Sequence, residues 1–328
     1  MSETISNLVH RARAAQKLIE FWDQEKVDEM VAATGWEVYK TEHARECARL
    51  AVEETGMGVF EDKLVKHQKK TLGTLRDFHG VRTVGIIEED AQKGLLKIAK
   101  PVGVVGALTP ITNASSTICV NGLSILKCRN AVIFAPHPSA KRTCELTAGY
   151  LRAGLRKVGA PEDLVLNLQD PSIELTQELM KEVDLVVATG GSAMVKAAYS
   201  SGTPAYGVGA GNSVTLVDET ADLADAGKKI FLSKTFDNAT SCSSENSAVV
   251  VESVFDQLLV EFNKHGGYLC NPSERSALMS AMWPDGFHLN RKVAGQPARK
   301  IAEMAGFGVP PNTTFLMVMG EVIGPEDP

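Results

Sequence analysis

Several features that would place this protein in a membrane, on a nucleic acid or around a structural metal are missing from its sequence. No apolar run is long enough to span a bilayer, and the chain, with a net charge of -6, contains no block of lysine and arginine. The six cysteines are scattered and form no CxxC pair. These absences argue against membrane, nucleic-acid and metal binding and against a disulfide framework, and they indicate a reducing, cytoplasmic setting.

The N-terminal quarter of the chain has the pattern of helices. Its first segment, "MSETISNLVHRARAAQKLIEFW", interrupts apolar residues with charge, as an amphipathic helix does and a signal peptide does not. Helix-length segments with polar faces continue to about residue 78. Residues 80–100 differ, because two short apolar runs flank the charged segment "EEDAQKG". We expect strands at 81–87 and 94–99 that pair as a projecting hairpin.

From residue 101 onward, continuous apolar runs alternate with segments of helix length. Such runs between helices are typical of a parallel sheet that helices cover on both faces. The sequence therefore predicts a doubly wound α/β fold, in a chain of 328 residues that is long enough for two domains. The expected strands lie in "PVGVVGAL" (101–108), "AVIFAP" (131–136), "DLVLNL" (163–168), "DLVVAT" (184–189) and "SVTLVD" (213–218).

Ligands of doubly wound sheets bind at the carboxyl ends of the strands, so the residues at those ends are candidates for a binding site. Thr109 and Pro110 follow one expected strand, and Gly190, Gly191 and Ser192 follow another. Glycines at such a turn allow a phosphate to approach backbone amides and the positive end of the next helix. A tight strand-to-helix turn explains them equally well, and the GxGxxG pattern of an ordinary dinucleotide site is absent.

One cysteine has unusual neighbours. The segment "DNATSCSSENSAVVVE" (237–252) places Cys242 among small polar residues, directly before a β-branched run. A structural cysteine usually has apolar neighbours, whereas a nucleophilic cysteine must be accessible and able to ionise. The polar surroundings favour a nucleophile slightly, with packing as the alternative.

Taken in chain order, "TPITN", "PHPSAK", "GGS", "GVGAGN" and "FDNATSC" resemble segments of the aldehyde dehydrogenase superfamily. "EETGMGVFEDKLVKH" (53–67) is similar to an element of its coenzyme A-acylating branch. The resemblance extends over essentially the whole chain. It implies a dinucleotide-binding domain at 1–233, with an oligomerisation hairpin at 80–100, and the N-terminal part of an α/β catalytic domain at 234–328. Family members continue well beyond that point, so the resemblance implies an incomplete catalytic domain.

The resemblance also implies catalytic roles. Cys242 matches the family nucleophile, whose thiolate adds to an aldehyde carbonyl to give a thiohemiacetal. Asn113 matches the asparagine whose side-chain amide, with the backbone N–H of Cys242, stabilises the resulting oxyanion. A helix N-cap is the alternative role for Asn113. Hydride then passes to a nicotinamide and leaves an acyl thioester on the enzyme.

The fate of that thioester depends on a missing carboxylate. Hydrolytic relatives carry a glutamate base after the dinucleotide-binding turn, but residues 199–217 contain no Asp or Glu. A thiol such as coenzyme A is largely self-sufficient as a nucleophile, so the resemblance implies acyl-CoA formation from a small aldehyde. Sulfoacetaldehyde, acetaldehyde, propionaldehyde and succinate semialdehyde are the candidate substrates. Two alternatives stay open: a phosphate-dependent reductase on the same fold, and an inactive, truncated protein that binds a nucleotide or a partner.

The nucleotide site is also read from the resemblance. His137 matches a position near the adenosine ribose, and Ser139, Lys141 and Arg142 lie close to it without an acidic residue from 135 to 143. This pattern favours NADP, with NAD as the alternative, because NAD enzymes often place a carboxylate on the ribose. The glycines of "GVGAGN", Gly209 and Gly211, complete the expected cofactor site. The resemblance further implies a homodimer or homotetramer for the complete protein, and poorly defined association for a chain that lacks the strand covering the hairpin.

Overall fold

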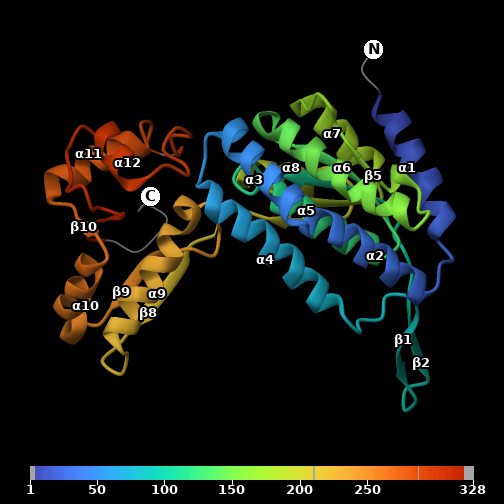
Figure 1. Cartoon of the computed structure of the whole chain (residues 1–328), viewed down its shortest axis with the longest axis horizontal. Helices are drawn as coiled ribbons and strands as arrows, with labels where there is room; N and C mark the ends of the chain where they lie inside the picture. Colours follow the sequence, from blue (N-terminus) through green and yellow to red (C-terminus); the bar gives the residue numbers. More distant parts are fainter. Residues whose placement is uncertain (1–3, 210, 287, 321–328) are drawn as a thin grey trace. The chain divides into compact units, whose positions relative to one another are not determined.

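The computed structural model describes residues 4–209, 211–286 and 288–320, which fold as two compact units (Figure 1). One unit contains 4–55 and 63–209, and the other contains 56–62 and 211–320. The sequence analysis divided the chain after residue 233 instead, and the functions that it gave to the two parts stay predictions. Within the described residues, every helix is too short or too polar to cross a lipid bilayer.

The first unit is built on a sheet of five parallel strands in the order β5-β4-β3-β6-β7. Every residue of β3 and β4 is buried, which explains why these strands appear in the sequence as continuous apolar runs. The predicted parallel sheet is confirmed. Its strands are β3 (Val104–Thr109), β4 (Ala131–Pro136), β5 (Val165–Asn167), β6 (Leu185–Thr189) and β7 (Ala205–Val208).

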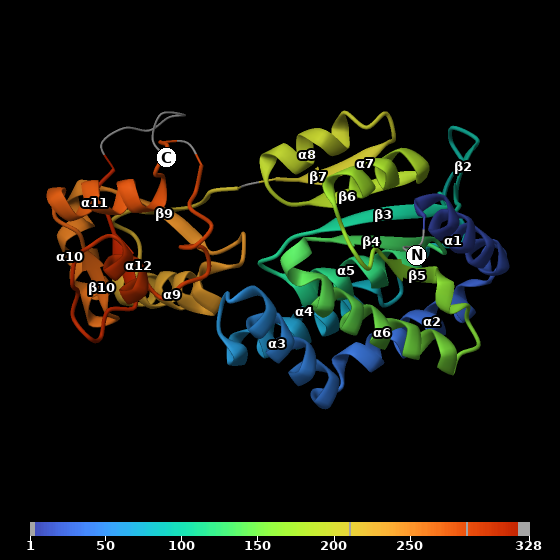
Figure 2. The same ribbon diagram turned by 90° about the horizontal axis from the view of Figure 1, so that it is seen from above.

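Helices cover both faces of this sheet, as the doubly wound fold requires. Figure 2 shows α5 and α6 on one face, with α2 packed behind them, and α1, α7 and α8 on the other. The short 3-10 turns η1 (Pro138–Ala140) and η2 (Glu162–Leu164) precede α6 and β5. The helices are α1 (Ile5–Ile19), α2 (Gln24–Tyr39), α3 (Thr41–Thr55), α4 (Phe60–Phe78), α5 (Ala114–Lys127), α6 (Lys141–Lys157), α7 (Ile173–Glu182) and α8 (Ser192–Tyr199).

The predicted hairpin is present, but its first strand lies later in the chain than expected. Strands β1 (Gly85–Asp90) and β2 (Leu95–Ala99) pair antiparallel, so the first strand begins at 85 rather than 81 and includes the first three residues of the charged segment. Glu88 and Glu89 pair in register with Lys97 and Leu96. An exposed two-stranded ribbon accepts charged side chains, and charge alone therefore placed the turn too early.

The second unit contains two small parallel sheets and its own apolar core, formed by Val217, Ile230, Leu258, Phe262 and Phe315. The assignment of 213–218 to the large sheet was wrong, because this strand, β8, pairs with β9 of the second unit. The edge position beside β6 is taken by β7, which is not among the strands expected from the sequence. The elements are β8 (Ser213–Val217), α9 (Leu223–Thr235), η3 (Phe236–Ala239), β9 (Glu245–Val250), α10 (Glu252–Lys264), β10 (Gly267–Leu269), α11 (Pro272–Met282), α12 (Ala298–Met304) and β11 (Phe315–Met317).

Candidate functional site

The carboxyl ends of β3 and β6 form the point at which the strand order of the large sheet reverses. From β3 the chain proceeds to β4 and β5 on one side, and then crosses to β6 and β7 on the other. In doubly wound folds ligands bind at this point, where the loops after adjacent strands leave the sheet in opposite directions. Thr109 ends β3, Pro110 follows it, and residues 190–192 follow β6. The structure thus places these five predicted cofactor residues at one edge of the sheet.

The turn after β6 has the geometry needed for close approach of a phosphate. Gly191 is the N-cap residue of α8, no side-chain bond caps that end of the helix, and Ser192 begins it. A Cβ atom at Gly191 would meet no other atom within 4 Å, so the backbone is open to a ligand there. Gly209 is exposed just after β7, whereas Gly211 belongs to the second unit and precedes β8. The backbone at Gly191 and the first amides of α8 are thus open to an anionic group, and their role in binding a dinucleotide stays a prediction.

The segment after β4 contains no acidic residue, but carboxylates from other parts of the chain lie next to it. His137 is the N-cap of η1 and accepts a hydrogen bond from the backbone N–H of Ser139 at 3.1 Å, which is the role of a histidine in a turn. The Lys141 ammonium forms an ion pair with Asp170, with an N–O distance of 2.7 Å. Lys141 thus has a carboxylate partner, which reduces the positive charge that it offers to a phosphate.

A second carboxylate lies at the N-terminus of α6. Glu54, from α3, accepts hydrogen bonds from the backbone N–H groups of Arg142 and Thr143 at 2.8 and 2.7 Å. It also accepts one from the Thr143 hydroxyl at 2.7 Å. The sequence analysis missed Glu54 and Asp170 because it searched for acidic residues only between 135 and 143.

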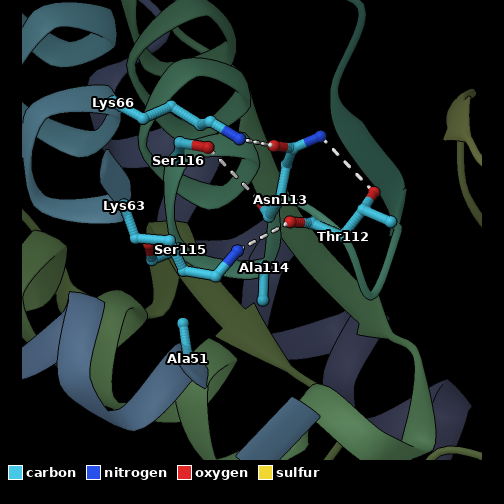
Figure 3. Close-up of a pocket in the computed structure, with 8 residues that line it drawn as sticks. All are labelled: Ala51, Lys63, Lys66, Thr112, Asn113, Ala114, Ser115 and Ser116. Carbon is cyan, nitrogen blue, oxygen red and sulfur yellow. Dashed lines mark hydrogen bonds between the residues drawn. The ribbon is translucent and has the colours of Figure 1, made fainter. Parts of the chain in front are cut away.

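Asn113 occupies the N-cap position of α5, but its side chain makes no capping hydrogen bond. Its Oδ1 accepts a hydrogen bond from the ammonium of Lys66 at 2.9 Å, and its Nδ2 lies 3.4 Å from the Thr112 hydroxyl, to which it donates (Figure 3). The N-cap alternative therefore accounts for the position of Asn113 in the chain and not for the contacts of its side chain.

Three residues of α4 hold the loop that carries Asn113. Lys63 and Lys66 are 6% and 5% exposed, and Lys63 donates a hydrogen bond to the backbone carbonyl of Thr112 at 3.2 Å. His67 is completely buried, and its Nε2 donates to a backbone carbonyl at 2.8 Å, so its Nδ1 accepts from the Ser115 hydroxyl at 3.2 Å. Burial lowers the pKa of His67 to about 4, so the ring is neutral near neutral pH.

Cys242 lies in the turn between η3 and β9, and its side chain is exposed. Loss of hydration raises the thiol pKa of all five other cysteines, to about 12 for Cys47 and about 11 for Cys270. Those thiols are protonated at neutral pH and therefore poor nucleophiles. Of the two exposed cysteines, Cys128 is the C-cap residue of α5, whereas Cys242 lies in the turn before β9.

The turn before Cys242 has a strained backbone. Asp237, Asn238 and Ala239 have φ values of 53°, 49° and 56°, a left-handed conformation that costs about 1–3 kcal/mol for each such residue. Hydrogen bonds hold it in place: the Val59 N–H donates to Asp237 Oδ1 at 2.9 Å, and the Asp237 N–H donates to Asp62 Oδ2 at 2.8 Å. The segment 56–62 thus supports the turn that leads to Cys242. The sequence analysis noted this segment only for its resemblance.

Comparisons with known proteins identify the family of the chain. Residues 1–275 match the model of a family described as the aldehyde dehydrogenase family. The chain is 51% identical over 320 residues to a sulfoacetaldehyde dehydrogenase of an Acholeplasma species, an alignment that covers 96% of this chain and 66% of that protein. The chain thus spans slightly less than two thirds of the length of this curated relative.

Two solved structures have the same fold. An acetylating aldehyde dehydrogenase from Geobacillus thermoglucosidasius is 38% identical, with a TM-score of 0.93, and the match covers 98% of this chain and 71% of that one. A propionaldehyde dehydrogenase from Rhodopseudomonas palustris, solved with bound propionyl-CoA, is 31% identical, with a TM-score of 0.86 and a coverage of 97% and 70%.

Proposed function

Because this chain belongs to the aldehyde dehydrogenase family, we propose that it is part of an acylating enzyme that converts a small aldehyde and coenzyme A to an acyl-CoA with a nicotinamide nucleotide as oxidant. The observation that carries the proposal is Cys242, an exposed cysteine that follows a strained turn held by hydrogen bonds to residues 59 and 62. Strained backbone of this kind is concentrated at functional sites.

The chemistry begins at Cys242. Its thiolate forms a bond to the aldehyde carbon, and the π electrons of the carbonyl move to the oxygen. A bound nicotinamide nucleotide supplies the hydride acceptor that this carbon needs in order to become a thioester. The sulfur of coenzyme A then attacks the thioester, loses its proton to solvent, and displaces the Cys242 thiolate. The products are acyl-CoA, reduced nucleotide and a proton.

Asn113 is proposed to stabilise the oxyanion. Its Oδ1 accepts a bond from an ammonium, so its Nδ2 is the group that donates to a negatively charged oxygen. A preorganised donor of this kind is typically worth about 10²–10³-fold in rate. The backbone N–H of Cys242 is the second proposed donor.

Coenzyme A is proposed as the acyl acceptor because residues 199–217, the segment in which hydrolytic relatives carry a base for water, contain no carboxylate. General-base help is worth about 10²–10⁴-fold to an attacking water. The name of one structural relative includes "acetylating", and another was solved with bound propionyl-CoA, which supports the same acceptor here. Sulfoacetaldehyde is the proposed substrate, because a relative with 51% identity carries its name and Ser241 and Ser243 flank Cys242 with hydroxyls.

NAD is proposed as the nucleotide, in place of the NADP favoured by the sequence. His137, Ser139, Lys141 and Arg142 keep their proposed place near the adenosine ribose. Glu54 occupies the first amides of α6 beside them, and Asp170 pairs with Lys141. A 2′-phosphate would meet two carboxylates here, whereas a ribose hydroxyl would not be repelled.

The test is an assay of the full-length protein with sulfoacetaldehyde, acetaldehyde and propionaldehyde, following the absorbance of the reduced nucleotide. We expect turnover that requires coenzyme A and that Cys242→Ala abolishes without loss of nucleotide binding. Equal turnover without coenzyme A would indicate a hydrolytic enzyme, and turnover that needs phosphate instead would indicate an acyl phosphate reductase. Activity retained by Cys242→Ala would rule out the thiohemiacetal.

A further inference from the structure

The contact between Lys66 and Asn113 has a consequence for catalysis. We propose that Lys66 is a positioning residue, which fixes the side-chain amide of Asn113 in the orientation that presents Nδ2 to the oxyanion and increases its strength as a donor. The inference rests on the proposed function, because it assumes that Asn113 is the oxyanion donor. It adds a residue that does not itself touch the substrate.

The ammonium group determines which way the amide points. An ammonium has three donors and no acceptor, so it accepts no hydrogen bond from the NH₂ group of an asparagine. The 2.9 Å contact with Lys66 therefore identifies the atom facing it as Oδ1 and turns Nδ2 to the opposite side. Figure 3 shows this arrangement, with Nδ2 directed toward Thr112. An uncharged partner at position 66 that donates and accepts equally would permit both orientations.

The surroundings of Lys66 prevent it from leaving Asn113. Lys66 is 5% exposed, so its ammonium has little access to bulk water. Lys63, one turn earlier on α4, donates to the Thr112 carbonyl, and His67 bonds to Ser115. Helix α4 therefore contacts residues both before and after Asn113 in the chain. An ammonium confined in this way holds its acceptor without the entropic cost that an exposed lysine pays.

The charge of Lys66 also changes the donor strength of the amide. A positive group on Oδ1 withdraws electron density through the conjugated amide and makes the Nδ2 protons more positive, as in cooperative hydrogen-bond chains. The same charge lowers the energy of a negative oxygen bound at Nδ2, and screening is weak at a buried site. Both effects are larger in the transition state, where the oxygen is negative, than with the neutral aldehyde.

The competing explanation is that Lys66 only anchors α4 to the loop, and Lys63 is the matched control for it. Both lysines are on the same face of α4, both are buried, and both bond to neighbouring residues of the same loop. They differ in the acceptor, which is a backbone carbonyl for Lys63 and the Asn113 side chain for Lys66. An anchoring role predicts similar behaviour for the two, and the positioning role predicts a difference.

The experiment is a double-mutant cycle in the full-length protein, with kcat and KM measured separately for the aldehyde. Asn113→Ala should lower kcat/KM by about 10²–10³-fold. Lys66→Met should lower it by about 10–100-fold, the usual range for loss of a charge-assisted hydrogen bond. The pair should be no slower than Asn113→Ala alone, because Lys66 acts through Asn113. Any loss from Lys63→Met should instead multiply with that from Asn113→Ala.

Two further variants keep the test decisive. Lys66→Arg should retain more activity than Lys66→Met, because it keeps a charged donor, and Lys66→Gln serves if the methionine variant does not fold. Independent, multiplying losses for Lys66→Met and Asn113→Ala would overturn the proposal, as would equal activity of the Arg and Met variants. If Asn113→Ala is fully active, the oxyanion assignment itself is wrong. If Asn113→Ala is impaired and its loss multiplies with that of Lys66→Met, only the proposed role of Lys66 is overturned.

Discussion

The carboxylate of Asp237 should hold the second unit in the conformation that supports Cys242. Asp237 is fully buried, and it accepts hydrogen bonds from the Val59 backbone N–H and from the Thr240 hydroxyl. Asp237→Ala removes both carboxylate oxygens, and the alanine side chain offers no acceptor in their place. The three left-handed residues of the turn then lose contacts that offset their backbone strain.

The size of the effect follows from the two donors that lose their partner. The Thr240 hydroxyl is buried and the Val59 N–H is partly buried, and loss of this acceptor costs about 1–3 kcal/mol for each donor, so the two together cost about 2–6 kcal/mol. Asp237→Asn keeps one acceptor oxygen and should cost about half as much. Asp256→Ala on α10 is the control, because Asp256 is an exposed aspartate of the same unit and such a change usually costs less than about 0.5 kcal/mol.

Native-state hydrogen exchange can measure this loss separately in each unit. In Asp237→Ala, the amides of β9 and α9 should exchange about 30-fold to 10⁴-fold faster, as a loss of about 2–6 kcal/mol predicts. The amides of β3 and β4 should exchange as in the wild type. Aldehyde oxidation by the full-length variant should fall at least about tenfold, as a small displacement of a nucleophile suffices for that. Unchanged protection of β9 together with full activity would refute the reasoning.

Three other predictions follow. Glu54→Gln should shift the ratio of kcat/KM values for NADP over NAD upward by about tenfold, as removing one unfavourable charge predicts, and an unchanged ratio would show that Glu54 only caps α6. Burial lowers the pKa of His67 from 6.5 to about 4, so the unfolded state binds the proton more tightly than the folded state. The free energy of unfolding should therefore fall as the pH decreases from 6.5 to 4, by up to about 1.4 kcal/mol per pH unit. Urea unfolding of His67→Gln should lose this slope, and an unchanged slope would assign it to other groups. Ile98 is 53% exposed on the hairpin and lies opposite Ile86. Ile98→Asp should therefore weaken the homo-oligomer expected for the full-length protein, which light scattering would measure as a lower mass. An unchanged mass would place the subunit contact elsewhere.

The sequence was sufficient for the parts of the fold in which burial is uniform. Strands β3 and β4 are buried on both faces, so every residue is apolar or small and the run is visible without a partner. Strand β7 was missed because it is short, contains Gly207 and alternates between partly buried and exposed residues. The sheet to which β8 belongs is decided by its partner β9, about thirty residues later, and no local pattern contains that information.

The same limit applies to the candidate site. Cys242 and Asn113 were proposed because they lie in recognisable segments, but the residues that contact Asn113 and the turn before Cys242 are distant in the chain. Lys66 is 47 positions from Asn113, and Val59 is 178 positions from Asp237. Such contacts depend on packing, which composition and periodicity do not describe. Glu54 was overlooked for the same reason. It accepts a hydrogen bond from the backbone amide of Arg142, which is 88 positions away in the chain.

The residues that contact the Asn113 loop and the turn before Cys242 come from one segment, 56–67, and these contacts give the segment a physical role. Residues 56–62 belong to the second unit, where Val59 and Asp62 bond to the turn that precedes Cys242. The residues that follow belong to the first unit, where Lys63, Lys66 and His67 bond to the loop of Asn113. A single stretch of chain thus supplies hydrogen bonds to the turn that precedes the proposed nucleophile in one unit and to the proposed oxyanion donor in the other. Substitutions across this stretch should therefore divide into two classes: those at 59 and 62 should reduce protection of β9 and α9, and those at 66 should lower turnover while leaving that protection unchanged.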